Sequence, residues 1–242
     1  MNPVIDQLRS HRSIRKYTSQ PIDEALFLQL IEAGQSSATS SFLQGATIIR
    51  VRNPDKRSAL AELSGNKHVN MAAEFLVFCA DLRRAGNCCE KYDKPFHGGY
   101  TEQFIIATID ATLMAQNVVV AAESAGLGIC YIGGVRNNPQ EISDLLGLPD
   151  HVYPVFGMCL GYPAHQPDVK PRLPVEAVLK EDTYTDDREL VAAFDDTMHA
   201  YYRSRKGGPK DSTWSQNLTP LFDSKLRPHM RDFLVRRGFE MK

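Results

Sequence analysis

The chain has 242 residues, of which 43% are hydrophobic and 24% are charged, enough for one large domain or two small ones with a hydrophobic core. Its net charge of −1 gives no general attraction to nucleic acid or anionic lipid, so any basic function has to be local. The N-terminus lacks the basic and apolar blocks of a signal peptide, and the longest apolar runs, VVVAA and FIIA, are far shorter than a membrane span. We therefore expect a cytoplasmic protein that has neither nucleic acid nor a membrane as a partner.

Two helices are predicted at the start of the chain. Asn2 is a plausible N-cap with Pro3 at the first helical position, and Asp23 can cap a second helix that Gly34 ends. The basic stretch HRSIRKYTSQPID, residues 11–23, lies in the connection between these helices. Its cations therefore lie in a solvated bend or converge on an anion.

Two strands are predicted next. Residues 36–44 are small and polar and indicate a loop, whereas 46–51 and 74–81 have the apolar composition of buried strands. A helix over 54–63 and a bend at 64–69 separate the two strands.

A long helix follows. The spacing predicts about 25 helical residues from Thr101 to just before Gly126, and the second half of this run is apolar nearly all round. Such a helix is buried on every side, either centrally or against a second subunit.

Two more strands and a polar helical arm complete the prediction. GICYIGGV, at 128–135, is typical of a strand that ends in its glycine pair. Residues 152–163 are typical of another buried strand. Between them Asn138 can cap a short helix, and from Asp187 the chain is helical and polar. The elements together predict an α+β fold with helices around a small sheet.

The cysteines and histidines indicate no catalytic or metal centre. The five cysteines form no C-x-x-C pair and are typical of reduced thiols in a cytosolic protein. The seven histidines show no metal-ligand spacing, and neither a G-x-S-x-G motif nor an acid/base pair stands out. We expect no metal and no catalytic side chain.

Several segments instead provide anion donors and small residues. The basic stretch provides cations, and SSATSS provides hydroxyl groups. YIGGVRN provides backbone amides that no Cβ obstructs at its glycines, and KPRLP holds two cations on a segment that its prolines stiffen. Each segment alone is a weak signal. In YYRSRKGGPK the cations either cap a helix or form a mobile anion site. Donors without catalytic side chains favour an enzyme whose cofactor does the chemistry.

The segments in order resemble the NADPH-dependent branch of the nitroreductase superfamily, which holds oxygen-insensitive nitroreductases and NADPH–flavin oxidoreductases. The resemblance runs from about residue 3 to 239 and rests on HRSIRKYTSQPI, SSFLQ, AEFLVFCAD, MAQNVVVAAESAGLGICYIGGVRNN, FGMCLGYP, KPRLP and TWS. It implies one domain over 1–242, folded as an intertwined homodimer of three-layer sandwiches with a central mixed or antiparallel sheet. Residues 187–242 would be a helical extension that wraps the dimer.

The resemblance also implies bound FMN in clefts at the subunit interface, with NADPH as the electron donor. The residues that would hold FMN are His11, Arg12, Ser13, Arg15, Asn66, Lys67, Tyr131, Ile132, Gly133, Gly134, Lys170 and Arg172. Ser40 and Ser41 would approach FMN from the other subunit. Asn66 and Lys67 stand in SGNKHV, one residue shorter than the family's usual Gly-Gly-Gln or Gly-Asn-Gln segment. NADPH and substrate would meet Arg15, Ser41, Phe42, Arg205 and Arg227, with Arg205 on the 2′-phosphate of NADPH.

The implied function is an FMN-dependent NADPH oxidoreductase with ping-pong kinetics, in which flavin N5 carries the hydride. Its oxidants would be nitroaromatics, nitrofurans and quinones. One alternative is an NADPH-dependent FMN reductase that supplies reduced flavin to a partner. The other is a flavin-binding store without significant turnover.

Overall fold

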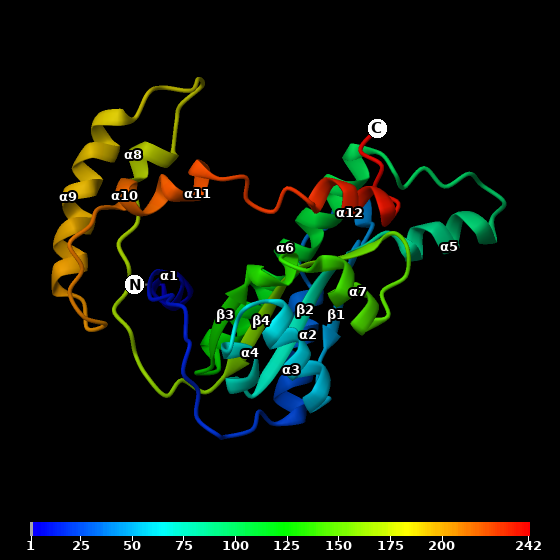
Figure 1. The fold of residues 1–242 in the computed structure, drawn as a ribbon, viewed down its shortest axis with the longest axis horizontal. Helices are drawn as coiled ribbons and strands as arrows, with labels where there is room; N and C mark the ends of the chain where they lie inside the picture. The colour runs from blue at the N-terminus through cyan, green and yellow to red at the C-terminus, as the bar shows by residue number, and fades with distance from the viewer. Residues whose placement is uncertain (1) are drawn as a thin grey trace. The chain divides into compact units, whose positions relative to one another are not determined.

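The computed structural model describes residues 2–242 (Figure 1). The chain forms two compact units. The first unit consists of Met1–Gln166 together with Arg227–Lys242, and the second consists of Pro167–Leu226. The second unit therefore begins before the predicted extension at 187 and does not include the last residues of the chain.

The first unit is built on a four-stranded sheet in the order β1-β2-β4-β3, antiparallel throughout. The strands are β1 (Ala46–Arg50), β2 (Glu74–Asp81), β3 (Gly128–Ile132) and β4 (Val152–Gly161). All four were predicted from their apolar runs, and every residue of β2 is buried. A strand that is buried along its whole length has both faces covered.

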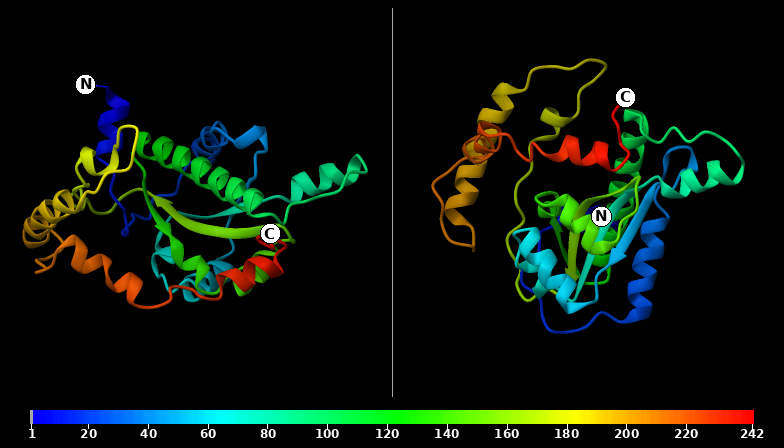
Figure 2. Two further views of the ribbon diagram at one scale, coloured as in Figure 1. Left: turned by 90° about the horizontal axis from the view of Figure 1, so that it is seen from above. Right: turned by 45° about the vertical axis from the view of Figure 1, so that its right-hand side comes forward.

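Helices cover the two faces of the sheet and make the three predicted layers. On one face Leu76, Phe78 and Met158 pack with α2 (Glu24–Gln35) and α6 (Thr101–Ser124), and Figure 2 shows α6 lying along the sheet. On the other face the alternate residues of β2, among them Phe75, lie in a second cluster with residues of α3 (Pro54–Leu63) and α7 (Pro139–Leu146). The α+β sandwich with an antiparallel central sheet is confirmed.

The helix starts follow the predicted caps. The Asn2 side chain accepts the Val4 amide at 2.9 Å and starts α1 (Pro3–Arg9), and Asp23 accepts two amides at the start of α2. Gly34 does not end α2, because the helix continues to Gln35. A Cβ at Gly34 would lie 2.6 Å from Val118 Cγ2, so this glycine lets α2 and α6 approach each other closely.

The long helix α6 ends at Ser124, close to the predicted end, but it is not buried on every side within one subunit. Its small residues face the sheet, whereas Ile105, Ile109 and Leu113 are exposed. Within residues 2–242 it is the helix whose length and apolar composition would allow it to cross a membrane. Its packing on the sheet and on α2 identifies it as a core helix.

Other elements depart from the sequence prediction. Asn138 precedes α7, but its side chain donates to the Leu63 carbonyl at 2.7 Å instead of capping the helix. The short helices α4 (His68–Met71), α5 (Arg83–Lys91) and α8 (Val175–Val178) were not predicted. Strand β3 ends at Ile132, and its glycine pair opens a 3-10 turn, η2 (Gly133–Arg136).

The polar C-terminal region is shared between the two units. The second unit contains α8, α9 (Arg188–Ser204), α10 (Trp214–Leu218) and α11 (Pro220–Asp223), with a small core around Phe194, Met198 and Tyr202. The last helix, α12 (Met230–Arg236), belongs to the first unit, where Phe233 and Phe239 are buried. That the C-terminal region wraps a dimer stays a prediction.

Candidate functional site

The basic stretch lies along the free edge of β3. The Ile14 amide donates to the Ile129 carbonyl at 2.8 Å, and the Thr18 amide donates to Tyr162 at 2.9 Å. Ile14 is buried, Ser13 is half-buried and Arg15 is exposed. The stretch is therefore not a loose bend, because its backbone is held against the sheet and its polar side chains flank a buried anchor.

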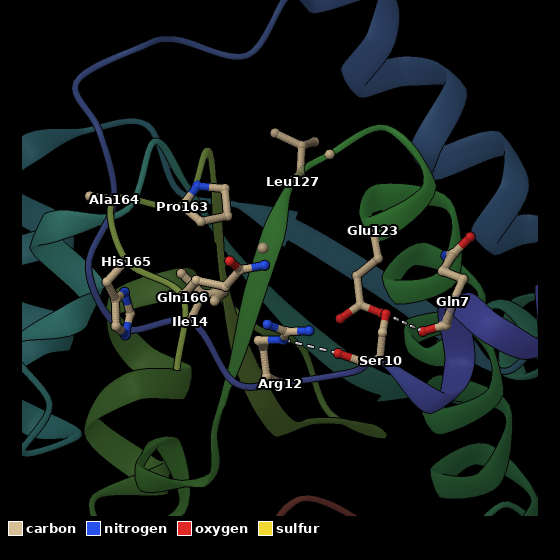
Figure 3. A pocket seen from close by; sticks show the side chains of 12 residues that line it. Gln7, Ser10, Arg12, Ile14, Glu123, Leu127, Pro163, Ala164, His165 and Gln166 are labelled. Carbon is tan, nitrogen blue, oxygen red and sulfur yellow. Dashed lines mark hydrogen bonds between the residues drawn. The ribbon is translucent and has the colours of Figure 1, made fainter. Parts of the chain in front are cut away.

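His11 and Arg12 lie at the N-terminal end of β3. His11 Nδ1 is 2.6 Å from Glu123 Oε1 in the last turn of α6. Arg12 Nε donates to the Ser10 carbonyl at 3.0 Å, and its side chain lines a cavity of about 530 Å³ together with Glu123 and His165 (Figure 3). The cavity has a cation, a carboxylate and several amide or hydroxyl groups in its wall.

The C-terminal end of β3 offers an aromatic ring and open backbone. Tyr131 is 37% exposed, packs edge-on against Phe156 at 5.1 Å, and its hydroxyl donates to Gln116 Oε1 at 3.5 Å. Burial, with a smaller contribution from the charge of Glu123, raises the pKa of Tyr131 to about 12. Ile132 is 1% exposed and lies in the core, so its side chain cannot line the site and only its backbone can.

The two glycines after β3 have different surroundings. A Cβ at Gly134 would lie 2.2 Å from the Ser64 carbonyl oxygen, so this residue packs against the bend at 64–69. A Cβ at Gly133 would approach only the Arg136 guanidinium, at 3.4 Å. Gly133 therefore has open space beside it that a ligand can occupy, whereas Gly134 has none.

The predicted residues of the 64–69 bend lie near this end of β3. Asn66 Oδ1 accepts the His68 amide at 3.1 Å, and Lys67 is exposed. Burial lowers the pKa of His68, and the charges of Arg15 and then Lys67 lower it further. Burial raises the pKa of Cys130, and the nearby charge of Arg15 acts in the opposite direction. The structure thus brings Arg15, Asn66 and Lys67 to one region.

Arg227 reaches the same region from the C-terminal part of the chain. Its Nε donates to Asn137 Oδ1 at 2.9 Å, and the Asn137 amide group donates to the Ser64 carbonyl at 3.1 Å. Asn137 thereby connects Arg227 to the bend beside Gly134 and to the end of η2.

Ser40 and Ser41 lie far from His11 within one subunit. They form the short turn η1 (Ser40–Phe42), which Asp110 of α6 holds through the Ser40 amide at 3.3 Å and the Gly45 amide at 2.8 Å. Thirteen residues of α6 separate Asp110 from Glu123, a distance of about 20 Å at 1.5 Å per residue. That this turn approaches the site of a second subunit stays a prediction.

The same turn exposes an aromatic ring. Phe42 is 79% exposed, and both Ser41 and Phe42 have positive φ, at 49° and 57°. Left-handed backbone is costly for residues with a Cβ and is typical of functional turns.

The remaining predicted residues belong to the second unit. Arg172 Nη1 donates to the Lys170 carbonyl at 3.2 Å. Arg205 directly follows α9, its Nε donates to the Gly208 carbonyl at 2.9 Å, and its guanidinium lies 5.5 Å from the centre of the Tyr202 ring. That Arg205 binds an anion stays a prediction.

Three residues of the site were not found from the sequence. Glu123 and Asp110 had a signal, because each is a carboxylate in a largely apolar part of the helix sequence, and Glu123 lies in the last turn, where the helix dipole disfavours it. Asn137 had no signal in the sequence, because its role depends on contacts with residues that are distant along the chain.

The fold and the site define an α+β protein with anion donors at one end of an edge strand and open backbone at the other. The chain matches the nitroreductase family over residues 8–162 and the C-terminal domain of the nitroreductase family over residues 170–242. The chain belongs to the nitroreductase family, as its motifs predicted.

Individual relatives cover nearly the whole chain. It is 42% identical over 241 residues to the oxygen-insensitive NADPH nitroreductase of Salmonella typhimurium, with 99% of both chains covered. It is 41% identical over 246 residues to the FMN reductase (NADPH) of Bacillus subtilis, again with 99% of both covered. The solved NADPH:FMN oxidoreductase from Vibrio harveyi, complexed with NAD+, superimposes with a TM-score of 0.90 at 40% identity, covering 98% of each chain.

Proposed function

We propose that this protein is an FMN-dependent NADPH oxidoreductase that reduces nitroaromatics, nitrofurans and quinones by two-electron, ping-pong hydride transfer. The names of the relatives support NADPH as donor, FMN as cofactor and nitro compounds or flavins as small-molecule substrates. The structural observation that carries the proposal is the arrangement along β3, with anion donors at its start and the open Gly133 at its end.

The residues present fit FMN in kind and in their order along β3. From Gly128 to Ile132 the strand rises about 13 Å, at about 3.3 Å per residue. A molecule with a phosphate at one end and a flat ring at the other matches a site with Arg12 at one end and Gly133 at the other. Arg provides paired donors for phosphate oxygens, and a glycine lets a ring approach the backbone.

Bound FMN would supply the two-electron acceptor and donor that the side chains of this site lack. His11, Arg12 and Ser13 would hold its phosphate. Lys170 and Arg172 stay predicted FMN contacts from the resemblance to the family. Positive charge at the ring end, from Arg15 and Lys67, favours the negative charge that reduction adds. Asn66, Tyr131 and the backbone of Ile132 and Gly134 would border the ring beside Gly133.

We also propose a homodimer whose interface includes the exposed face of α1 and α6. Gln7 Nε2 donates to the Val120 carbonyl at 2.5 Å and holds α1 beside α6. Large apolar side chains are exposed on the two helices, namely Val4, Ile5 and Leu8 with Ile105, Ile109 and Leu113. Large apolar side chains exposed on a surface are typical of an interface, and a second copy would bring Ser40, Ser41 and Phe42 to the site.

Substrate and NADPH contacts complete the proposal. Arg15, Ser41, Phe42 and Arg227 would border the oxidant, and Arg205 would bind the 2′-phosphate of NADPH with its planar fork of donors. We place the enzyme in the cytoplasm, as its unpaired cysteines suggested.

An anaerobic titration tests the function. The purified protein should be yellow, bleach within the mixing time when NADPH is added, and regain its colour when a quinone or nitrofurazone follows. Colour that NADPH does not bleach would favour a flavin store. Turnover with free FMN that exceeds turnover with nitrofurazone and quinones would favour the flavin reductase, and protein that takes up no flavin would refute all three interpretations.

A further inference from the structure

Glu123, which lines the cavity near Arg12, forms a partly buried pair with His11. His11 Nδ1 and Glu123 Oε1 are 2.6 Å apart, and the side chains are 27% and 14% exposed. A carboxylate can only accept a hydrogen bond, so Nδ1 is the donor. In Figure 3 Glu123 extends from α6 toward the Ser10–Arg12 segment.

Glu123 is placed where the fold alone does not favour a carboxylate. It lies in the last turn of a 24-residue helix with no basic residue in that turn, so the negative end of the helix dipole opposes its charge. A carboxylate removed from water also needs a partner. His11 provides that partner, and the other polar side chains in the cavity wall are Gln7, Ser10, Arg12, His165 and Gln166.

The pair determines which atom of His11 meets a ligand. With Nδ1 held by Glu123, Nε2 is the ring atom left to face a bound group. Carboxylate partners of this kind fix the orientation and protonation pattern of a histidine. A ring that donates through both nitrogens carries the positive charge that suits a phosphate oxygen.

We infer that Glu123 is a positioning residue for the flavin phosphate, which it affects through His11 and does not touch. The inference rests on the proposed function, because it assumes that the ligand of His11 is the phosphate of FMN. The competing interpretation is a purely structural link between α1 and α6, in parallel with the contact from Gln7 to Val120.

Riboflavin separates these interpretations because it has the same ring as FMN but lacks the phosphate. Flavin-free wild type and Glu123→Gln are titrated with FMN and with riboflavin at low salt, and binding is followed by flavin fluorescence. The glutamine keeps an acceptor for Nδ1 and removes the charge. The Kd for FMN should rise about fivefold to tenfold, about 1–1.4 kcal/mol, while the Kd for riboflavin stays within twofold.

Matched variants complete the test. Glu102→Gln, at the exposed start of the same helix, should change neither Kd. In a His11→Gln background Glu123→Gln should have no further effect on FMN. If Glu123→Gln does not fold, Glu123→Asp, which keeps the charge but withdraws it from Nδ1, should show the same selective loss.

The outcomes are distinct. An FMN affinity that is unchanged or higher in Glu123→Gln, or an equal loss for FMN and riboflavin, overturns the role of Glu123 and leaves the proposed function intact. A wild-type protein that binds no FMN overturns both.

Discussion

The two adjacent glycines after β3 allow cofactor binding to be separated from folding. We predict that Gly133→Ala weakens FMN binding in a stable protein, whereas Gly134→Ala destabilises the protein itself. The same chemical change, one methyl group, is made at neighbouring positions of one turn. The surroundings of the added methyl therefore account for any difference between the variants.

The magnitudes follow from the distances. At Gly134 the new Cβ would lie 2.2 Å from the Ser64 carbonyl oxygen, which is backbone and buried, so η2 or the 64–69 bend has to move. Overpacking of this kind costs about 1–3 kcal/mol, and each kcal/mol lowers the Tm of a domain of this size by about 2–4 °C. We expect the Tm of the flavin-free protein to fall by roughly 2–12 °C.

At Gly133 the new Cβ would meet only the end of the Arg136 side chain, at 3.4 Å. A Gly→Ala change without steric conflict stabilises a protein by about 0.4–1 kcal/mol through the unfolded chain, so the Tm should stay or rise slightly. A methyl in the space proposed for the flavin ring should cost about 1–3 kcal/mol in FMN binding, or roughly one to two decades in Kd.

The assay measures both properties on the same flavin-free preparations. Thermal unfolding gives the Tm, and fluorescence titration gives the Kd for FMN and for riboflavin, which should weaken in parallel because both have the ring. A Gly133→Ala variant with wild-type affinity for both flavins would refute the placement of the ring beside Gly133.

The other predictions concern the phosphate, the donor and the dimer. Arg12→Ala removes charge-assisted donors that contribute about 1.5–3 kcal/mol, so the protein should lose FMN on dialysis, and full flavin occupancy would contradict this. Arg205→Ala should raise the KM for NADPH about tenfold and leave the KM for NADH unchanged; an unchanged preference would leave Arg205 with only its helix-end contacts. Ile109→Asp places a charge on the exposed face of α6 and should yield monomers in analytical ultracentrifugation, whereas a dimer that persists at nanomolar concentration would place the interface elsewhere.

Local signals explain which parts of the fold could be predicted. The caps at Asn2 and Asp23 and the apolar run of β2 are each determined by residues close in sequence, and the structure contains them as expected. Gly34 was misassigned because its reason is a contact with Val118, far along the chain. Helix α5 was missed because its sequence, RRAGNCCEK, has no large apolar residue to mark a helical face, and the helix buries no residue.

The candidate site also has one part that the sequence predicted and another that it did not. The donors at 11–15 are adjacent in sequence, so their clustering was visible, and the structure adds that β3 holds them. The partner of His11 is 112 residues away, and the difference between Gly133 and Gly134 depends on the distant Ser64. No pattern within a window of the sequence contains these pairings.

The basic stretch has two roles that share one cause. An edge strand exposes unpaired backbone groups that invite wrong pairing, and the stretch covers this edge of β3 through Ile14. The same hydrogen bond fixes the backbone on which Ser13 and Arg15 are carried, so cations that repel each other are held in place by the sheet. A bound phosphate near His11 and Arg12 would offset the positive charge at that end of the stretch. Flavin binding and the backbone pairing of residues 11–18 should therefore stabilise each other, whereas Gly133→Ala is expected to weaken FMN binding without destabilising the protein.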